Sequence, residues 1–302
     1  MPSISIKRFN MKNWVQLIVS FLAIPTTLFS ATLHADPMVW KAIKDNQQLM
    51  LIGTIHLGQK SMYPLPSQLE QFMKQSDGLI LEADVNAPPP KIDFSHATLT
   101  VNILTSEQRK KLEDIATELT LDTTALLHFP PWLTAISIEN QAFQTLGYDA
   151  NLGVDSVLAD QAQALKLPLL TFETITQQLN MLQNLPEDGK SLLLDTLESW
   201  HEEKGFYQCM IQRWQDGDKS GLLKLLSLGG WDEDTSQSLL YSRNQIWSDK
   251  IQDPTFLSPK GQYVIAVGTL HLIGENSLIE HLEKDGYHIE LITQSQSSHC
   301  RI

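Results

Sequence analysis

The sequence predicts an α/β fold in which a central mixed or parallel sheet carries a largely helical insertion. Short apolar runs alternate with helical patterns at both ends of the chain, as is typical of strands joined by crossover helices. Between these ends, residues from about 106 to 252 are mainly helical in pattern. The two ends also resemble each other, because each has an apolar run followed by Gly-Thr-x-His.

The N-terminal end is expected to form strands and one helix. Apolar residues at helical spacing predict a helix over 67–75, with Ser67 as its cap. Pro88-Pro89-Pro90 predicts a stiff extended loop. Strands are expected over 40–43, 49–54 and 79–81, the last of which ends at Glu82.

The middle of the chain is expected to be helical with one returning strand. Thr105 and Gln108 have the spacing of a capping box, which predicts a helix from residue 106. Further helices are expected over 154–166, 176–184, 187–217 and 233–252, with a strand over 167–172.

The C-terminal end repeats the order of the N-terminal end, with a strand over 262–267, a helix over 274–285 and a strand over 289–293. In each half an Asp-Gly pair precedes the second strand, which carries an acid, Glu82 or Glu290. Chance similarity of two short apolar runs is the alternative, and the repeated Gly-Thr-x-His weakens it. Because no Gly/Ser-rich linker divides the chain, residues 36–302 are predicted to be one domain.

The composition limits which classes of function are possible. The 302 residues carry 35 acidic and 22 basic side chains, a formal net charge of −13. An acidic chain argues against nucleic acid as a partner, because nucleic-acid binders need a cationic surface. The sequence leaves the oligomeric state open.

Residues 1–35 have the order of a secretory signal peptide. Basic residues come first, a mostly apolar stretch covers 14–29, and Ala35 is the expected cleavage site. Translation could also start at Met11, which gives a more usual signal length. We therefore expect a periplasmic or secreted protein. The alternative is an uncleaved membrane anchor, which the short run and Pro25 disfavour.

The number of cysteines, two (Cys209 and Cys300), is consistent with an exported protein. An even number in an oxidising compartment predicts one disulfide, tying a central helix to the C-terminus. Two unpaired thiols are the alternative. The sequence has no Cys-x-x-Cys, so a redox motif is not supported.

Three polar residues are expected to meet at the carboxyl edge of the sheet. His56, His271 and Glu82 each follow an apolar strand, and ligands bind at that edge in open α/β sheets. Gly53 and Gly268 would let the backbone turn closely there. Two imidazoles and one carboxylate make a metal-ligand set with positions left open for water and substrate. The alternative is that each group is a satisfied strand-end residue.

The motifs together resemble the TraB/GumN family, which includes the pheromone-shutdown protein PrgY and the Tiki proteases. The resemblance implies a fold related to erythromycin esterase and ChaN, and metal-dependent hydrolysis of a peptide or protein. It implies His56, Glu82 and His271 as ligands, or immediate partners, of Mn²⁺, Co²⁺, Zn²⁺ or Fe²⁺. The matching segments are 53–56, 79–82, 131–132, 153–155, 172–174 with Gln178 and Leu179, 243–244 with Trp247, and 267–272.

Other matched residues invite roles by their type. Asp155 could cap a helix or serve the site. Glu173 could be a general base, or could orient a histidine. Arg243 could hold a substrate carboxylate or stabilise an oxyanion, or could form a salt bridge to Asp155 or Glu173. Asn244 joins Gly53, Gly268 and Asp155 as supporting residues, whereas Trp132 is interpreted as packing and Glu290 as an exposed strand residue.

Two classes of function follow. The first is an exported metal-dependent hydrolase, most simply a peptidase, in which Glu173 and Arg243 are the catalytic candidates. The second is a non-catalytic binding protein on the same scaffold, for haem, another small ligand or a cell-envelope polysaccharide role. A shared fold does not choose between them.

Overall fold

A computed structural model describes residues 35–88, 90, 94–200, 203–228 and 233–300. The chain divides into two units, Met1–His34 and Ala35–Ile302, and the following description concerns the second unit. The predicted signal segment therefore lies outside the described residues, apart from Ala35. Within the described residues, none of the helices has the length and apolar character needed to cross a bilayer.

A six-stranded mixed sheet forms the centre of the fold, which confirms the predicted α/β class. The strands lie in the order β4-β3-β5-β2-β1-β6, and β1 runs in the opposite direction to the other five. They are β1 (Val39–Lys44), β2 (Gln47–Thr54), β3 (Gly78–Leu81), β4 (Leu169–Thr171), β5 (Gln262–Gly268) and β6 (His288–Leu291).

The two similar ends are both strand–helix–strand crossovers. In the first, α1 (Ser67–Met73) connects β2 to β3, and in the second α13 (Leu278–Lys284) connects β5 to β6. β2 and β5 lie side by side and parallel, with Thr54 opposite Gly268. The two Gly-Thr-x-His segments therefore leave the sheet next to each other, at the edge where the sequence places the site.

The sheet separates two hydrophobic cores. Alternate residues of each strand face opposite sides, so Ile52 packs with α1 whereas Leu51 packs with α13. Helices α5, α6 and α8 contribute to the α1 side, and α12 lies with α13 on the other side. Trp132 is buried, as expected of a packing residue, and Glu290 is exposed on β6.

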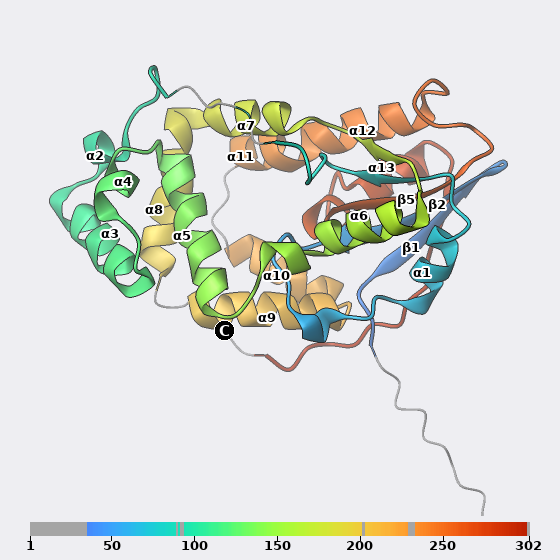
Figure 1. Ribbon diagram of the computed structural model, residues 1–302, viewed down its shortest axis with the longest axis horizontal. Coiled ribbons are helices and arrows are strands. Elements are labelled where there is room, and N and C mark those ends of the chain that lie inside the picture. Colours follow the sequence, from blue (N-terminus) through green and yellow to red (C-terminus); the bar gives the residue numbers. More distant parts are fainter. Residues whose placement is uncertain (1–34, 89, 91–93, 201–202, 229–232, 301–302) are drawn as a thin grey trace, which may run out of the picture. The chain divides into compact units, whose positions relative to one another are not determined.

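Part of the helical middle forms an insertion, while α6 and α12 cover the sheet. In Figure 1, α2, α3, α4, α5 and α8 lie together at the end away from the strands. The capping box of Thr105 and Gln108 starts α3 as predicted. The helices are α2 (Thr100–Ile103), α3 (Ser106–Leu119), α4 (Thr123–Leu127), α5 (Pro131–Thr145), α6 (Val154–Leu165), α7 (Ile175–Gln183), α8 (Lys190–Ser199), α9 (Glu203–Gln215), α10 (Lys219–Leu228), α11 (Glu233–Ser236) and α12 (Ser242–Gln252).

Three helix predictions were wrong in detail. Ser67 is the first residue of α1, not its cap, because the cap position belongs to Pro66. The helix predicted from residue 274 begins at 278, because Gly274 and Asn276 take left-handed φ angles of 84° and 52°. The single pattern over 187–217 forms two helices, α8 and α9.

The disulfide prediction is confirmed. Cys209 in α9 is bonded to Cys300, with 5.4 Å between the Cα atoms. The C-terminal tail is also held by Asp216 and Asp218, which accept hydrogen bonds from Ser298. The tail is therefore fixed by the covalent bond to α9 and by polar contacts to the turn that follows α9.

Candidate functional site

The two Gly-Thr-x-His segments pack directly against each other. A Cβ atom on Gly53 would lie 2.6 Å from the Thr269 hydroxyl oxygen and 2.8 Å from the Thr269 Cα atom. The same hydroxyl donates to the carbonyl oxygen of Thr54 at 3.0 Å. Gly53 is therefore required because the second segment approaches more closely than any side chain allows.

His56 lies two residues beyond β2, in a loop held against the start of α6. The Val154 N–H donates to the Ile55 carbonyl at 2.9 Å, and a Cβ on Gly153 would overlap the His56 carbonyl oxygen at 2.3 Å. His56 Nδ1 donates to Asp155 Oδ2 at 2.8 Å. The side chain of His56 is 67% exposed and that of Asp155 is 11% exposed. His56 therefore presents its Nε2 side to solvent while Asp155 holds Nδ1.

Asp155 serves this histidine rather than the helix end. Gly153 occupies the cap of α6 and no side chain accepts from the first turn. Desolvation lowers the pKa of His56, but the hydrogen bond and charge of Asp155 outweigh it and raise the pKa to about 9. The hydrogen bond and the charge of Asp155 therefore favour the protonated imidazole of His56.

His271 has the opposite environment. It ends the short helix η6 (Thr269–His271), and its side chain is 5% exposed. Its Nδ1 donates to Asn244 Oδ1 at 2.7 Å, because the Asn244 amide group donates to the Asn276 carbonyl at 2.8 Å. Burial, reinforced by the positive charge of Arg243, lowers the pKa of His271 to about 3. His271 is therefore neutral, with a lone pair on Nε2.

Glu82 follows β3 and reaches both halves of the site. Its Oε1 accepts from the Gly268 N–H at 2.7 Å and lies 3.7 Å from His271 Nε2. Its Oε2 accepts from Arg243 and from Gln178 at 3.1 Å. Burial raises the pKa of Glu82, but its coupling to His271, the positive charge of Arg243 and the Gly268 N–H outweigh it and lower the pKa to about 2.

Arg243, on α12, is the centre of the buried cluster. It forms ion pairs with Glu173 at 2.9 Å and with Glu82 at 2.5 Å, and it lies over the Trp247 ring. The Trp247 N–H also donates to Glu173, at 2.9 Å. The salt bridge from Arg243 to Glu173, one of the predicted alternatives, is confirmed. The general-base role of Glu173 stays a prediction.

A π-helical turn precedes Arg243. The turn, η5, covers Gln237–Tyr241, and the Leu239 carbonyl within it accepts from Arg243 Nη1 at 2.9 Å. π-Helical turns widen a helix by one residue and often occur at functional sites. Here the turn directs a backbone carbonyl to the guanidinium.

The structure brings most predicted site residues together. Glu82, Glu173, Arg243, Asn244 and His271 form one hydrogen-bonded cluster, and His56 with Asp155 forms a pair close enough to influence Glu82 and His271 by charge. In the described part of the chain, no three His, Cys, Asp or Glu side chains surround a common point as metal ligands would. No role was predicted for Gln178 or Trp247, although both stand in the matched motifs.

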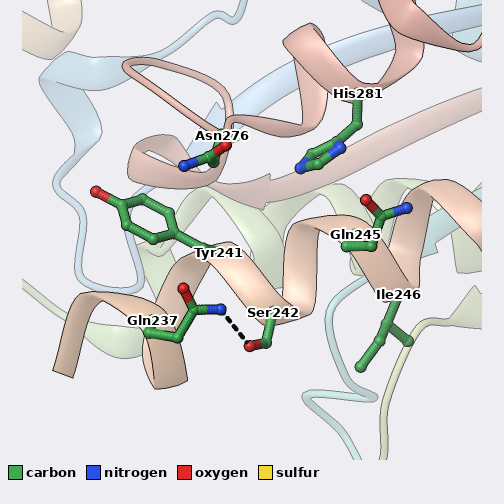
Figure 2. Close-up of a pocket in the computed structure, with 7 residues that line it drawn as sticks. All are labelled: Gln237, Tyr241, Ser242, Gln245, Ile246, Asn276 and His281. Carbon is green, nitrogen blue, oxygen red and sulfur yellow. Dashed lines mark hydrogen bonds between the residues drawn. The ribbon is translucent and has the colours of Figure 1, made fainter. Parts of the chain in front are cut away.

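A hollow of about 420 Å³ lies between α12 and α13 (Figure 2). Figure 2 shows the His281 ring on one wall, with Tyr241 and Gln245 opposite it. The lining carries no acidic residue, Lys or Arg and consists of Gln237, Tyr241, Ser242, Gln245, Ile246, Asn276 and His281. Asn276 connects this hollow to the site, because its carbonyl holds Asn244 and Asn244 holds His271.

The fold and the site define an α/β protein with a buried Glu–Arg–His cluster beside an exposed His–Asp pair. The chain belongs to the TraB/PrgY/gumN family, whose model matches residues 38–291. It is 32% identical over 257 residues to the uncharacterized protein YbaP of Escherichia coli strain K12, and 32% identical to YbaP of Shigella flexneri. Each match covers 83% of this chain and 96% of the relative. No solved structure matches.

Proposed function

We propose that the chain is an exported metal-dependent hydrolase that cleaves peptides. The observation that carries the proposal is that two histidines have their Nδ1 atoms held, by Asp155 and by Asn244, beside a buried carboxylate. Metal-binding histidines commonly donate their second ring nitrogen to such a partner. The disulfide supports export, because disulfides persist in oxidising compartments. The family resemblance supports a peptide substrate.

The donor atoms fit a divalent metal in their chemistry. His56 and His271 would offer Nε2 and Glu82 an oxygen, a set that suits Zn²⁺, Mn²⁺, Co²⁺ or Fe²⁺. When bound, such an ion would lower the pKa of its water and polarise the scissile carbonyl. The site as described engages Glu82 and His271 with Arg243, so these donors are not free while the guanidinium stays in place.

The proposed site residues differ in how far they are exposed to solvent, and this suggests different roles for them. His56 is 67% exposed, whereas the side chains of Glu82 and His271 are 10% and 5% exposed. His56 is therefore the proposed ligand that a substrate in solution can reach most readily. Charges that are so little exposed act in a low dielectric, where a guanidinium stabilises a developing oxyanion more strongly than it would in water.

The His56–Asp155 pair favours a second candidate, hydrolysis without a metal. Asp155 fixes the imidazole and leaves Nε2 open to solvent, where a neutral His56 would accept a proton from attacking water. The raised pKa of His56 places that activity above about pH 9. The two candidates differ in their response to chelators.

The test uses the purified mature chain, treated with a chelator and then given each metal in turn. Cleavage of a peptide library is followed by mass spectrometry. The proposal expects cleavage only with metal, and its loss in His56→Ala. His288→Ala is the matched control, because His288 is also exposed but lies on β6. Undiminished cleavage in chelator would favour the metal-free candidate, and a Soret band with haem but no cleavage would favour the binding protein.

A further inference from the structure

The guanidinium of Arg243 has no spare donor. An arginine side chain carries five N–H groups. Nε donates to Glu173, Nη1 to Leu239 O and His271 Nε2, and Nη2 to Glu82 and Glu173. The side chain is 11% exposed. Because all five N–H groups are hydrogen-bonded and the side chain is largely buried, Arg243 is held in one position within the site.

Two of these acceptors are atoms that the proposed metal requires. His271 Nδ1 donates to Asn244, so its single lone pair is on Nε2, and Arg243 Nη1 already uses it at 3.0 Å. Glu82 Oε1 accepts from Gly268, and Oε2 accepts from Gln178 and Arg243. Glu82 still has an unused acceptor site on Oε1, on the side of His271. A metal bound by His271, however, must take the Nε2 lone pair that now binds the guanidinium.

The charges lead to the same result. Glu82 and Glu173 carry two negative charges against the single positive charge of Arg243, so the buried cluster attracts an added cation. A divalent ion between Glu82 and His271 would nevertheless repel a guanidinium that donates to the same two residues. The two cations cannot share the Nε2 lone pair of His271.

We propose that Arg243 is a built-in competitor for the metal, which holds Glu82 and His271 in place until the metal displaces it. This inference rests on the proposed metal-dependent function. Displacement would also remove two of the three donors that occupy Glu173, leaving the Trp247 N–H. Metal entry would thereby free both catalytic candidates, Glu173 and Arg243, to face a substrate.

The direct test measures metal affinity. The chelated full chain is titrated with Zn²⁺, Mn²⁺ or Co²⁺ by calorimetry, and wild type is compared with Arg243→Met and Arg243→Lys. Competition predicts that Arg243→Met binds metal about tenfold or more tightly than wild type, with Arg243→Lys between them. Adding His271→Ala to Arg243→Met should abolish the gain, which would place the metal on the shared lone pair.

The matched control is Arg109→Met, which removes one positive charge from an exposed ion pair on α3. It should leave the affinity unchanged. Equal affinities in wild type and Arg243→Met would overturn the competition while leaving metal binding intact. No binding by any variant would overturn the metal-dependent function as well, so the two failures are distinguishable.

A second measurement keeps the proposal testable if Arg243→Met does not fold. In wild type, the Nε–H signal of Arg243 is followed by NMR and assigned by its loss in Arg243→Lys. Saturating metal should shift this signal and speed its exchange with solvent, while the signal of Arg213 stays fixed. Metal binding without any change at Arg243 would show that the two cations occupy separate places.

Discussion

The two Gly-Thr-x-His segments lie side by side on β2 and β5, yet their histidines have opposite environments. His56 is 67% exposed and paired with Asp155, whereas His271 is 5% exposed and paired with Asn244. The pKa is raised to about 9 in one and lowered to about 3 in the other. The motif therefore sets the path of the backbone, and the residues packed against it set the charge of the imidazole.

The difference follows from the element that covers each segment. The first segment continues into a loop beside the start of α6, where a carboxylate is available and solvent reaches the ring. The second turns into η6 beneath α12, where Trp247 lies 4.4 Å from the imidazole and Asn244 provides a neutral partner. The first segment therefore provides an exposed histidine paired with a carboxylate, and the second provides a buried, neutral histidine.

The largest effect should come from breaking the contact between the segments. Gly53→Val forces a side chain into the backbone of Thr269, and we expect unfolding free energy to fall by about 4 kcal/mol. Urea unfolding followed by circular dichroism measures it. Gly205→Ala is the control, because nothing lies within 4 Å of a Cβ there. A Gly53→Val protein as stable as wild type would mean that the segments are not in contact.

The next largest effect should distinguish the two acids that follow the segments. Glu82→Ala removes the partner of Gly268, Gln178 and Arg243, and should cost about 3 kcal/mol. Glu290→Ala removes an exposed side chain and should change stability by less than about 0.5 kcal/mol. Similar losses in the two variants would contradict the different burial of the two acids.

The histidines themselves should differ by less. His271→Ala removes the partner of Asn244 Oδ1 and of one N–H of Arg243, and opens space beside Trp247, at a cost of about 2 kcal/mol. His56→Ala should cost under about 0.5 kcal/mol, because the ring is exposed. Both should lose peptide cleavage. A stable His271→Ala protein that still cleaved peptides would remove His271 from the site.

The sequence predicted the parts of the fold that depend on local pattern. The apolar strands and the capping box at Thr105 require only near neighbours, and the paired Gly-Thr segments indicated which strand ends would meet. The split at α8 and α9 and the late start of α13 were missed. In α13 the reason is the left-handed Gly274 and Asn276, which a helical pattern does not reveal.

The sequence allowed the residues of the candidate site to be predicted, but not which of them would hydrogen-bond to which. Glu82, His271 and Arg243 come from segments far apart in sequence, and which donor fills which lone pair depends on how α12 packs on β5. Asp155 shows the limit most clearly, because capping α6 and holding His56 are equally compatible with its position. The hydrogen bond to His56 resolves that choice.

The smallest effect tests the charge difference between the histidines directly. Asp155→Asn keeps the shape of the partner but removes its charge, so the pKa of His56 should fall from about 9 towards the usual 6.5. NMR titration of the His56 ring measures it. The pKa of His271, which faces Asn244, should hardly change.

The free energy of unfolding should depend on pH in the direction that the raised pKa of His56 implies. Because the pKa of His56 is raised on folding, its pairing with Asp155 contributes fully below about pH 6.5 and is lost as the pH rises through about 9. The exposure of His56 limits that contribution to about 0.5 kcal/mol. Asp155→Asn should therefore be less stable than wild type at pH 6 and nearly equal to it at pH 10. A loss of stability that is the same at both pH values would mean that Asp155 acts on α6 through its shape. The two segments would then differ in exposure, but not through the charge of Asp155.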